Sequence, residues 1–166
     1  MRVTSQPRRW CTIGVYGFDL ETFLSRLHAA DVRLVVDVRQ RRGVRGPDYA
    51  WANSLRLQGA LAEAGIGYAH HRELAPTTEL RHLQYAEDHL KGVGKRNRRE
   101  LGADYIRRYT AEILNPADLT PLLAEAQEAG TAALLCVERD APACHRSLIA
   151  GRLAGHHRVI IEHLRP

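Results

Sequence analysis

Apolar runs alternate with amphipathic segments along the chain, and this pattern predicts strands that alternate with helices. The apolar runs predict strands at 11–17, 33–39, 66–74, 131–138 and 158–164. The amphipathic segments predict helices at 19–30, 53–64, 78–90, 100–114, 120–129 and 144–155. This order predicts a single three-layer α/β domain over 11–166, with a mainly parallel, roughly five-stranded sheet and helices on both faces. Residues 1–10 are predicted to be a flexible amino-terminal segment.

Several helix ends carry recognisable signals. Asp19 is placed to cap the first helix, and Gly65 follows the second. Pro121 falls in the first turn of the fifth helix, which Gly130 ends. Gly155 is predicted to end the last helix.

Polar residues collect where the predicted strands end. In open parallel sheets ligands bind beyond the carboxyl ends of the strands, so these residues are expected to meet at one edge. The residues concerned are Gly14 and Tyr16, Asp37 and Arg39, His70 or His71, Cys136 and Glu138, and then Cys144, His145 and Arg146. The sequence therefore predicts a site at this edge.

Cys144 is expected to act as the nucleophile or as an acid. If Asp140 caps the following helix, Cys144 lies in its first turn, where exposed amides together with His145 and Arg146 favour a thiolate. The alternative is a small buried thiol that packs the helix onto the sheet. Cys136, late in an apolar strand, is the thiol better suited to packing.

Four further residues are candidates for catalysis. His145 adds positive charge beside Cys144, and Glu138 and His71 are candidate proton-transfer groups. Asp37 is either catalytic or the cap of a loop. Glu138 is either a general base or a partner of nearby arginines.

Arginines predict an anion-binding function for the site. Arg39 and Arg146 are expected to hold a phosphate or carboxylate, with Arg42 and Tyr105 as further substrate contacts. Alternatively, Arg39 and Arg146 form a structural network with Asp37 and Glu138, and such a network can also orient an arginine toward a ligand.

Composition narrows the class of protein. The chain has 166 residues, 45% of them hydrophobic, and a formal net charge of +5. No apolar run approaches the about 20 residues that span a bilayer. Three cysteines and no secretory signal predict a cytoplasmic protein with reduced thiols and no membrane partner.

The positive charge is concentrated in two stretches, 39–45 and 91–99. Lys95, Arg96, Arg98 and Arg99 define the second function to consider, a non-catalytic nucleic-acid-binding module whose affinity falls steeply with salt. The simpler interpretation of each stretch is a solvated loop.

No metal and no cofactor are assigned from the sequence. The cysteines and the histidine at 136–145 have zinc-ligand chemistry, but their spacing is Cys-x7-Cys-His and the chain has no Cys-x2-Cys pair. The first strand is not followed by Gly-x-Gly-x-x-Gly, and no Cys-x5-Arg loop is present.

Five segments together resemble the domain of unknown function 488 family. They are TIG (12–14), VDVR (36–39), EAGIGYAHHREL (63–74), YIRRY (105–109) and LLCVERDAPACHR (134–146). The resemblance covers about residues 11–164 and implies a compact α/β fold with a shared polar site, but no particular reaction. The family's polar motif positions fall on Asp37, Arg39, His71, Cys136, Glu138, Cys144, His145 and Arg146. The chain departs from the family pattern in VYG after TIG and in the basic stretch KGVGKRNRR.

The leading hypothesis is an enzyme, a hydrolase or transferase, that acts on a small anionic or phosphate-bearing substrate such as a nucleotide. The main alternative is the nucleic-acid-binding module, and a third is a small accessory protein whose polar edge is purely structural.

Overall fold

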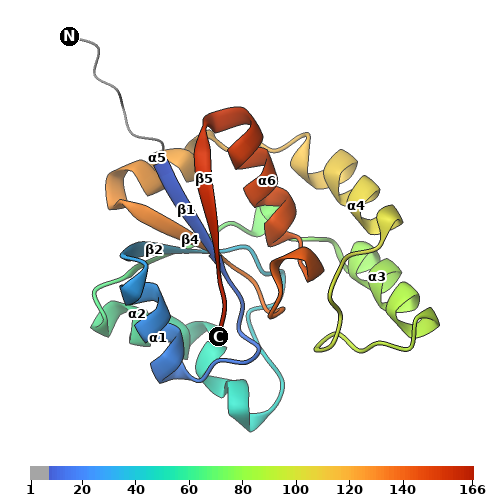
Figure 1. Cartoon of the computed structure of the whole chain (residues 1–166), viewed down its shortest axis with the longest axis horizontal. Helices are drawn as coiled ribbons and strands as arrows, with labels where there is room; N and C mark the ends of the chain where they lie inside the picture. Colours follow the sequence, from blue (N-terminus) through green and yellow to red (C-terminus); the bar gives the residue numbers. More distant parts are fainter. Residues whose placement is uncertain (1–7) are drawn as a thin grey trace.

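A five-stranded, all-parallel sheet in the order β3-β2-β4-β1-β5 forms the centre of the computed structural model, which describes residues 8–166 (Figure 1). The strands are β1 (Arg8–Ile13), β2 (Val32–Asp37), β3 (Gly67–His70), β4 (Thr131–Leu135) and β5 (Val159–Leu164). The predicted α/β fold with five strands is confirmed.

Six α-helices and four short helical turns connect the strands. The α-helices are α1 (Leu20–Ala29), α2 (Ser54–Glu63), α3 (Thr78–Leu90), α4 (Ala103–Tyr109), α5 (Thr120–Ala129) and α6 (Arg146–His157). The short turns are η1 (Pro47–Ala52), η2 (Arg72–Leu74), η3 (Thr110–Leu114, a π-helical turn that continues α4) and η4 (Ala141–Ala143).

The helices cover both faces of the sheet. From β1 the chain steps across the sheet to β2 and then β3, whereas from β3 it returns to β4 and then β5. Because parallel crossovers are right-handed, the two directions place helices on opposite faces. Accordingly, α1 and α2 lie together on one side of the strands in Figure 1, and α5 and α6 lie on the other.

The first helix illustrates how the local sequence specifies the fold. The Asp19 carboxylate accepts a hydrogen bond from the Thr22 backbone N–H (2.8 Å), and the Thr22 hydroxyl accepts one from the Asp19 backbone N–H (3.1 Å). Phe23 and Leu27, one helical turn apart, are fully buried against the sheet. Burial of each side chain contributes about 1.5–3 kcal/mol.

Several predicted boundaries are wrong. β1 begins at Arg8, three residues before the predicted strand, so Arg8–Trp10 belong to the sheet, and residues 1–7 lie outside the described part. α6 passes Gly155 and ends at His157, because Arg158 adopts the left-handed conformation (φ 51°) that stops it.

The start of α6 also differs from prediction. Asp140 does not cap this helix, because its carboxylate pairs with Arg165 and the turn η4 intervenes. Cys144 is extended (φ −140°) and precedes the first helical residue, Arg146, by two positions.

None of the helices within residues 8–166 is long and apolar enough to cross a membrane.

Candidate active site

A pocket of about 730 Å³ opens at the carboxyl ends of β2 and β4. Its buried floor consists of Cys136, Glu138, Cys144 and His145, which are 1–6% exposed. We call these four residues the floor. All four come from the segment that joins β4 to α6, so one short stretch of chain supplies the reactive groups.

Close packing between two strand ends holds the floor. The backbone N–H groups of Val15 and Tyr16, just after β1, donate to the Val137 carbonyl (2.9 and 3.0 Å). A Cβ atom at Gly14 would lie 1.9 Å from the Glu138 carbonyl oxygen, so this position requires glycine. The TIG motif therefore has a physical role, because its glycine lets the β4–α6 segment pass directly over β1.

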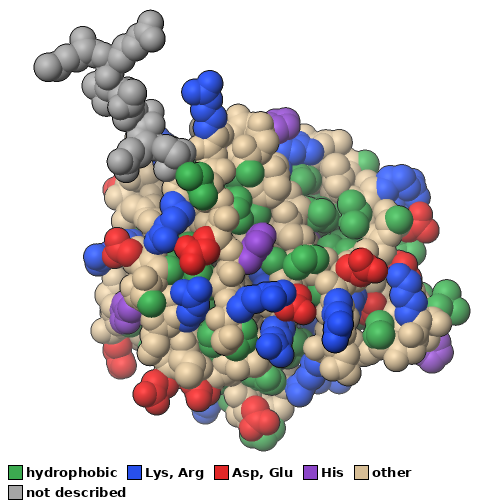
Figure 2. Space-filling view, in the orientation of Figure 1, with side chains coloured by type: hydrophobic (Ala, Val, Ile, Leu, Met, Phe, Trp, Pro, Cys, Tyr) green, Lys and Arg blue, Asp and Glu red, His purple; other side chains and the backbone are tan. Residues whose placement is uncertain are grey.

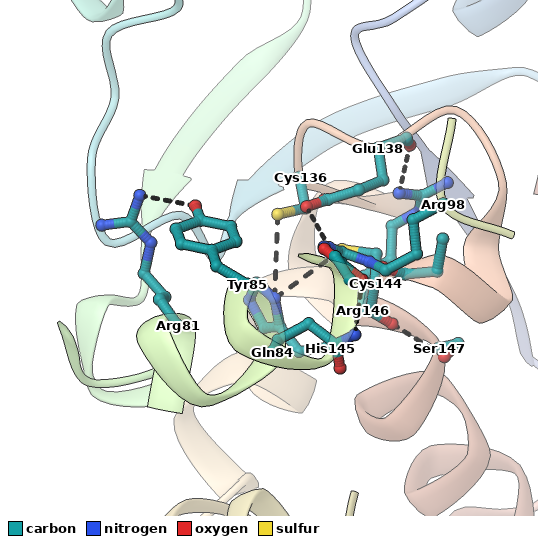
Figure 3. Close-up of polar contacts among 12 residues, drawn as sticks. Arg81, Gln84, Tyr85, Arg98, Cys136, Glu138, Cys144, His145, Arg146 and Ser147 are labelled. Carbon is teal, nitrogen blue, oxygen red and sulfur yellow. Dashed lines mark hydrogen bonds and ion pairs between the residues drawn. The ribbon is translucent and has the colours of Figure 1, made fainter. Parts of the chain in front are cut away.

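His145 lies between the two thiols of the floor (Figure 3). Its Nδ1 is 3.7 Å from the sulfur of Cys136 and 3.7 Å from the sulfur of Cys144. Its Nε2 donates a hydrogen bond to the Val38 carbonyl (2.8 Å). Because that bond holds the proton on Nε2, Nδ1 faces the sulfurs and can exchange a proton with either of them.

The pKa values of the two thiols are shifted in opposite directions. Burial opposes ionisation of Cys144, but the hydrogen bond from Cys136 and the positive charges of His145 and Arg146 outweigh it and bring the pKa of Cys144 well below its usual value. Burial and the neighbouring Cys144 raise the pKa of Cys136 well above its usual value. Burial alone would lower the pKa of His145, yet the adjacent Cys144 thiolate raises it. The floor therefore favours a Cys144 thiolate, a Cys136 thiol and a His145 imidazolium.

Glu138 is the single acidic residue of the pocket lining. Its Oε1 accepts a hydrogen bond from Arg98 (2.9 Å), whereas its buried Oε2 has no hydrogen-bond partner among the described residues. Burial and the nearby Cys144 raise the pKa of this carboxyl, against the pull of Lys95 and Arg98. A carboxyl with a raised pKa and an unused oxygen is suited to deliver and accept protons.

Asp37 and Arg39 form a buried ion pair beside the floor. The Arg39 guanidinium donates from Nε to Oδ1 and from Nη2 to Oδ2 of Asp37 (both 2.9 Å), and Tyr68 donates to the same carboxylate (2.6 Å). Arg39 lines the pocket, but Asp37 does not. Asp37 and Arg39 therefore form the structural ion pair that was the alternative to direct substrate binding, and this pair holds Arg39 at the pocket wall.

Arg146 lies away from the pocket. Its guanidinium donates to the backbone carbonyls of Glu138 (2.6 Å) and Arg139 (3.2 Å), and it is 1% exposed. It does not line the cavity. Its observed role is to hold the loop that carries Glu138 rather than to contact an anion, which corrects the sequence-based expectation.

His71 is also outside the pocket lining. Its ring donates to the carboxylates of Glu73 (2.6 Å) and Glu125 (2.9 Å). Burial would lower the pKa of His71, but these two carboxylates raise it. The third strand therefore does not contribute His71 to the floor, because the chain turns into η2 directly after this residue.

Five cations surround the pocket entrance, and we call them the rim: Arg41, Arg45, Arg81, Lys95 and Arg96. They are exposed or half-buried, and none of them forms an ion pair within residues 8–166. Lys and Arg side chains gather around the lower centre of the face in Figure 2, near the carboxyl end of β5.

The predicted basic loop divides into different roles. Arg96 lies over the rings of Tyr16 and Tyr49, each 5.2 Å away, and Lys95 lines the pocket with its pKa raised by Glu138 against the effect of burial. Arg98 is buried and pairs with Asp88 (2.6 Å) and Glu138. Arg99 is exposed and outside the pocket lining.

Two predicted substrate contacts have different positions. Tyr105 lines the pocket, stacked on Tyr109, and burial raises its pKa. Arg42 is not part of the lining, and its guanidinium donates to the Tyr68 hydroxyl (3.4 Å).

Sequence reasoning missed the contribution of α3. Arg81, Gln84 and Tyr85 line the pocket from one helical face, and Arg81 donates to the Tyr85 hydroxyl (3.0 Å; Figure 3). The spacing 81, 84, 85 marks a helical face with polar groups, and Gln84 is buried. These polar residues on one face of a predicted helix are the sequence signal that could have indicated a contribution of α3 to the pocket.

Cys136, Cys144 and His145 are also the group of described residues whose ligand atoms are close enough to share a metal ion, within 4.8 Å of one another. Coordination of a metal ion by both sulfurs requires two thiolates, and a bound ion itself favours deprotonation of its thiol ligands. The arrangement is compatible with a metal ion as well as with nucleophilic chemistry, and the absence of a metal stays a prediction.

The fold and the site together define an α/β protein with a cysteine-centred pocket surrounded by cations. The chain matches the model of the family described as Domain of unknown function DUF488 over residues 19–153, most of its length, and it belongs to that family. No curated protein and no solved structure matches the chain.

Proposed function

We propose that this protein is an enzyme that binds a small anionic, phosphate-bearing substrate and transfers a group from it to Cys144. The observation that carries this proposal is the position of the five rim cations, which have no carboxylate partner among the described residues and line the same pocket as the buried Cys144 and His145. A hydrolase and a transferase share this first step and differ only in the acceptor.

Recognition rests on the rim. Guanidinium and ammonium groups that lack an internal carboxylate partner are available for phosphate oxygens, and Arg is suited to bidentate contacts. The cavity of about 730 Å³ is in the size range of pockets for small molecules and is large enough for a nucleotide. Tyr16 and Tyr85 in the same lining offer aromatic surface for a base or another flat group.

Catalysis rests on the floor. The Cys144 thiolate attacks the electrophilic centre of the substrate, and the bond to the leaving group breaks as the new bond to sulfur forms. Glu138 in its protonated form gives its proton to the leaving group. Water or an acceptor hydroxyl then attacks the thio-linked intermediate, Glu138 takes the proton, and the Cys144 thiolate is restored. His145 as imidazolium stabilises the thiolate before the attack and after release.

Alkylation tests the nucleophile. The rate of modification of Cys144 by iodoacetamide is expected to follow a titration with a midpoint well below the about 8.5 of a free thiol, and inorganic phosphate or pyrophosphate is expected to slow it. Cys11 is the internal control, because it lies in β1 outside the pocket lining and burial raises its pKa to about 11. If the midpoint for Cys144 is at or above about 8.5, Cys144 is not an activated nucleophile. If neither phosphate nor pyrophosphate slows the alkylation, the pocket is not an anion-binding site.

The nucleic-acid-binding alternative stays a separate prediction. It requires the basic loop to be a free phosphate-binding surface, but Arg98 is committed to Asp88 and Glu138. Binding to single-stranded DNA or RNA that weakens steeply with salt and is lost in a quadruple Lys95, Arg96, Arg98 and Arg99 to Met variant would support it. Arg98 is structural in this fold, so the variant lacking only the Lys95, Arg96 and Arg99 charges is the decisive one.

A further inference from the structure

The floor contains a second sulfur that the proposed transfer reaction does not use. Cys136 and Cys144 are both free thiols, both line the pocket, and their sulfur atoms lie within 4.8 Å of each other. A disulfide bond needs about 2.05 Å, so the sulfurs have to approach by less than about 3 Å. The pair is eight positions apart in the sequence, joined by the η4 turn.

We propose that Cys144 is a site of oxidation by peroxides and that Cys136 resolves the oxidised form as an intramolecular disulfide. The proposal rests on three geometrical facts: the proximity of the sulfurs, the contact of His145 Nδ1 with both, and the opening of a pocket onto both. A small oxidant such as hydrogen peroxide can enter this pocket, although each thiol is almost fully buried.

The first step forms a sulfenic acid. The Cys144 thiolate attacks one oxygen of the peroxide, an S–O bond forms and the O–O bond breaks. The hydroxide that leaves takes the Nδ1 proton of the His145 imidazolium and departs as water. Sulfur is oxidised by two electrons and the peroxide is reduced by two.

The second step forms the disulfide. Neutral His145 takes the proton of the Cys136 thiol, and the resulting thiolate attacks the sulfur of Cys144. The S–S bond forms as the S–O bond breaks, and the leaving hydroxide regains the proton from His145 to give a second water. Two thiols and one hydrogen peroxide thus give one disulfide and two waters. His145 ends the first step neutral, which is the state that the second step requires.

The third cysteine is excluded by its position. Cys11 is fully buried in β1 and does not line the pocket, and burial raises its pKa to about 11. The pairing is thus specific to the floor. The disulfide would occupy the sulfur that the proposed function uses as its nucleophile, so oxidation would switch that activity off reversibly. This regulatory consequence rests on the proposed function, whereas the disulfide itself does not.

Thiol counting tests the disulfide in the full-length chain. After one equivalent of hydrogen peroxide, the unfolded protein is expected to retain one titratable thiol of its three, with a mass loss of two hydrogens and a peptide that links Cys136 to Cys144. A thiol reductant is expected to restore all three. A count that stays at three, or a link through Cys11, overturns the inference.

Two variants separate the steps. Cys136→Ser is expected to stop at the sulfenic acid, trapped on Cys144 by dimedone, whereas Cys11→Ser is expected to form the disulfide as the wild type does. No dimedone adduct in Cys136→Ser, or a full disulfide yield without Cys136, contradicts the proposed roles.

The outcome is distinguishable from failure of the proposed function. Rapid alkylation of Cys144 with protection by phosphate, but no disulfide, overturns this inference and leaves the function intact. Disulfide formation, with no protection of Cys144 by phosphate, supports this inference and overturns the proposed function.

Discussion

The floor and the rim of the pocket differ in almost every physical respect. The floor is buried, comes from one segment of the chain, and consists of two thiols, an imidazole and a carboxyl that shift one another's pKa values. The rim is exposed or half-buried, comes from three separate segments, and consists of cations without ion pairs within residues 8–166. In the proposed function, the floor carries out the chemistry and the rim recognises the substrate.

Arg98 connects the two parts. It follows the rim residues Lys95 and Arg96 in the chain, but its guanidinium is buried against Asp88, Glu138 and the Ala143 carbonyl. The loop that supplies two of the five rim cations, Lys95 and Arg96, is therefore anchored in the floor. The comparison predicts that changes at the anchor alter folding, that changes in the floor alter reactivity, and that changes in the rim alter affinity.

Arg98→Met has the largest expected effect. The substitution leaves the carboxylates of Asp88 and Glu138 buried without their cation, and removal of one member of a buried ion pair costs about 3–5 kcal/mol. Urea unfolding measures the loss. Arg99→Met is the matched control, since Arg99 is exposed and makes no side-chain hydrogen bond within residues 8–166, and it is expected to change stability by less than about 0.5 kcal/mol. Equal effects of the two substitutions would contradict the anchor role.

His145→Asn is expected to move the alkylation profile of Cys144 to higher pH. Burial opposes ionisation of Cys144 and the positive charge of His145 favours it, so loss of that charge raises the pKa of Cys144. The measurement is the alkylation rate against pH. His82→Asn removes another imidazole of the pocket lining that has no hydrogen bond to either sulfur, and its profile should match the wild type. Identical profiles for both variants would show that His145 does not activate the thiol.

Lys95→Met is expected to weaken pyrophosphate binding by about fivefold, because a partly solvated charge contact contributes up to about 1 kcal/mol. Calorimetry at low salt measures the affinity. Lys91→Met is the control from the same loop, as Lys91 pairs with Glu87 and does not line the pocket. If both variants bind pyrophosphate as tightly as the wild type, Lys95 has no part in recognition.

The sequence predicts the floor of the pocket better than it predicts the rim. Cys136, Glu138 and Cys144 follow from the periodicity, because strand ends in a parallel sheet must meet at one edge. Arg81 and Lys95 do not follow, because the path of α3 and of the loop after it depends on tertiary packing that no local pattern encodes.

Side-chain direction is the other limit of the sequence. Periodicity places Arg146 and His71 near the site, yet Arg146 turns toward the carbonyls of Glu138 and Arg139 and His71 toward two carboxylates. Buried polar groups must be satisfied by whichever partner the fold brings within reach. That partner is a tertiary property.

His71→Gln has the smallest expected effect, and it tests whether His71 lies outside the floor. Its pKa in the folded protein is raised by Glu125 and Glu73, so the imidazolium stabilises the fold fully below the unfolded-state value of about 6.5, and this contribution is lost as the pH rises through the folded-state pKa. His71→Gln should therefore reduce stability at pH 6 by less than about 1 kcal/mol, because both carboxylates are largely exposed, and should have a smaller effect at pH 9. Urea unfolding at the two pH values measures this difference. Cys144 alkylation in the same variant should be unchanged, since neither sulfur of the floor contacts His71; a shifted alkylation midpoint would place His71 in the site after all.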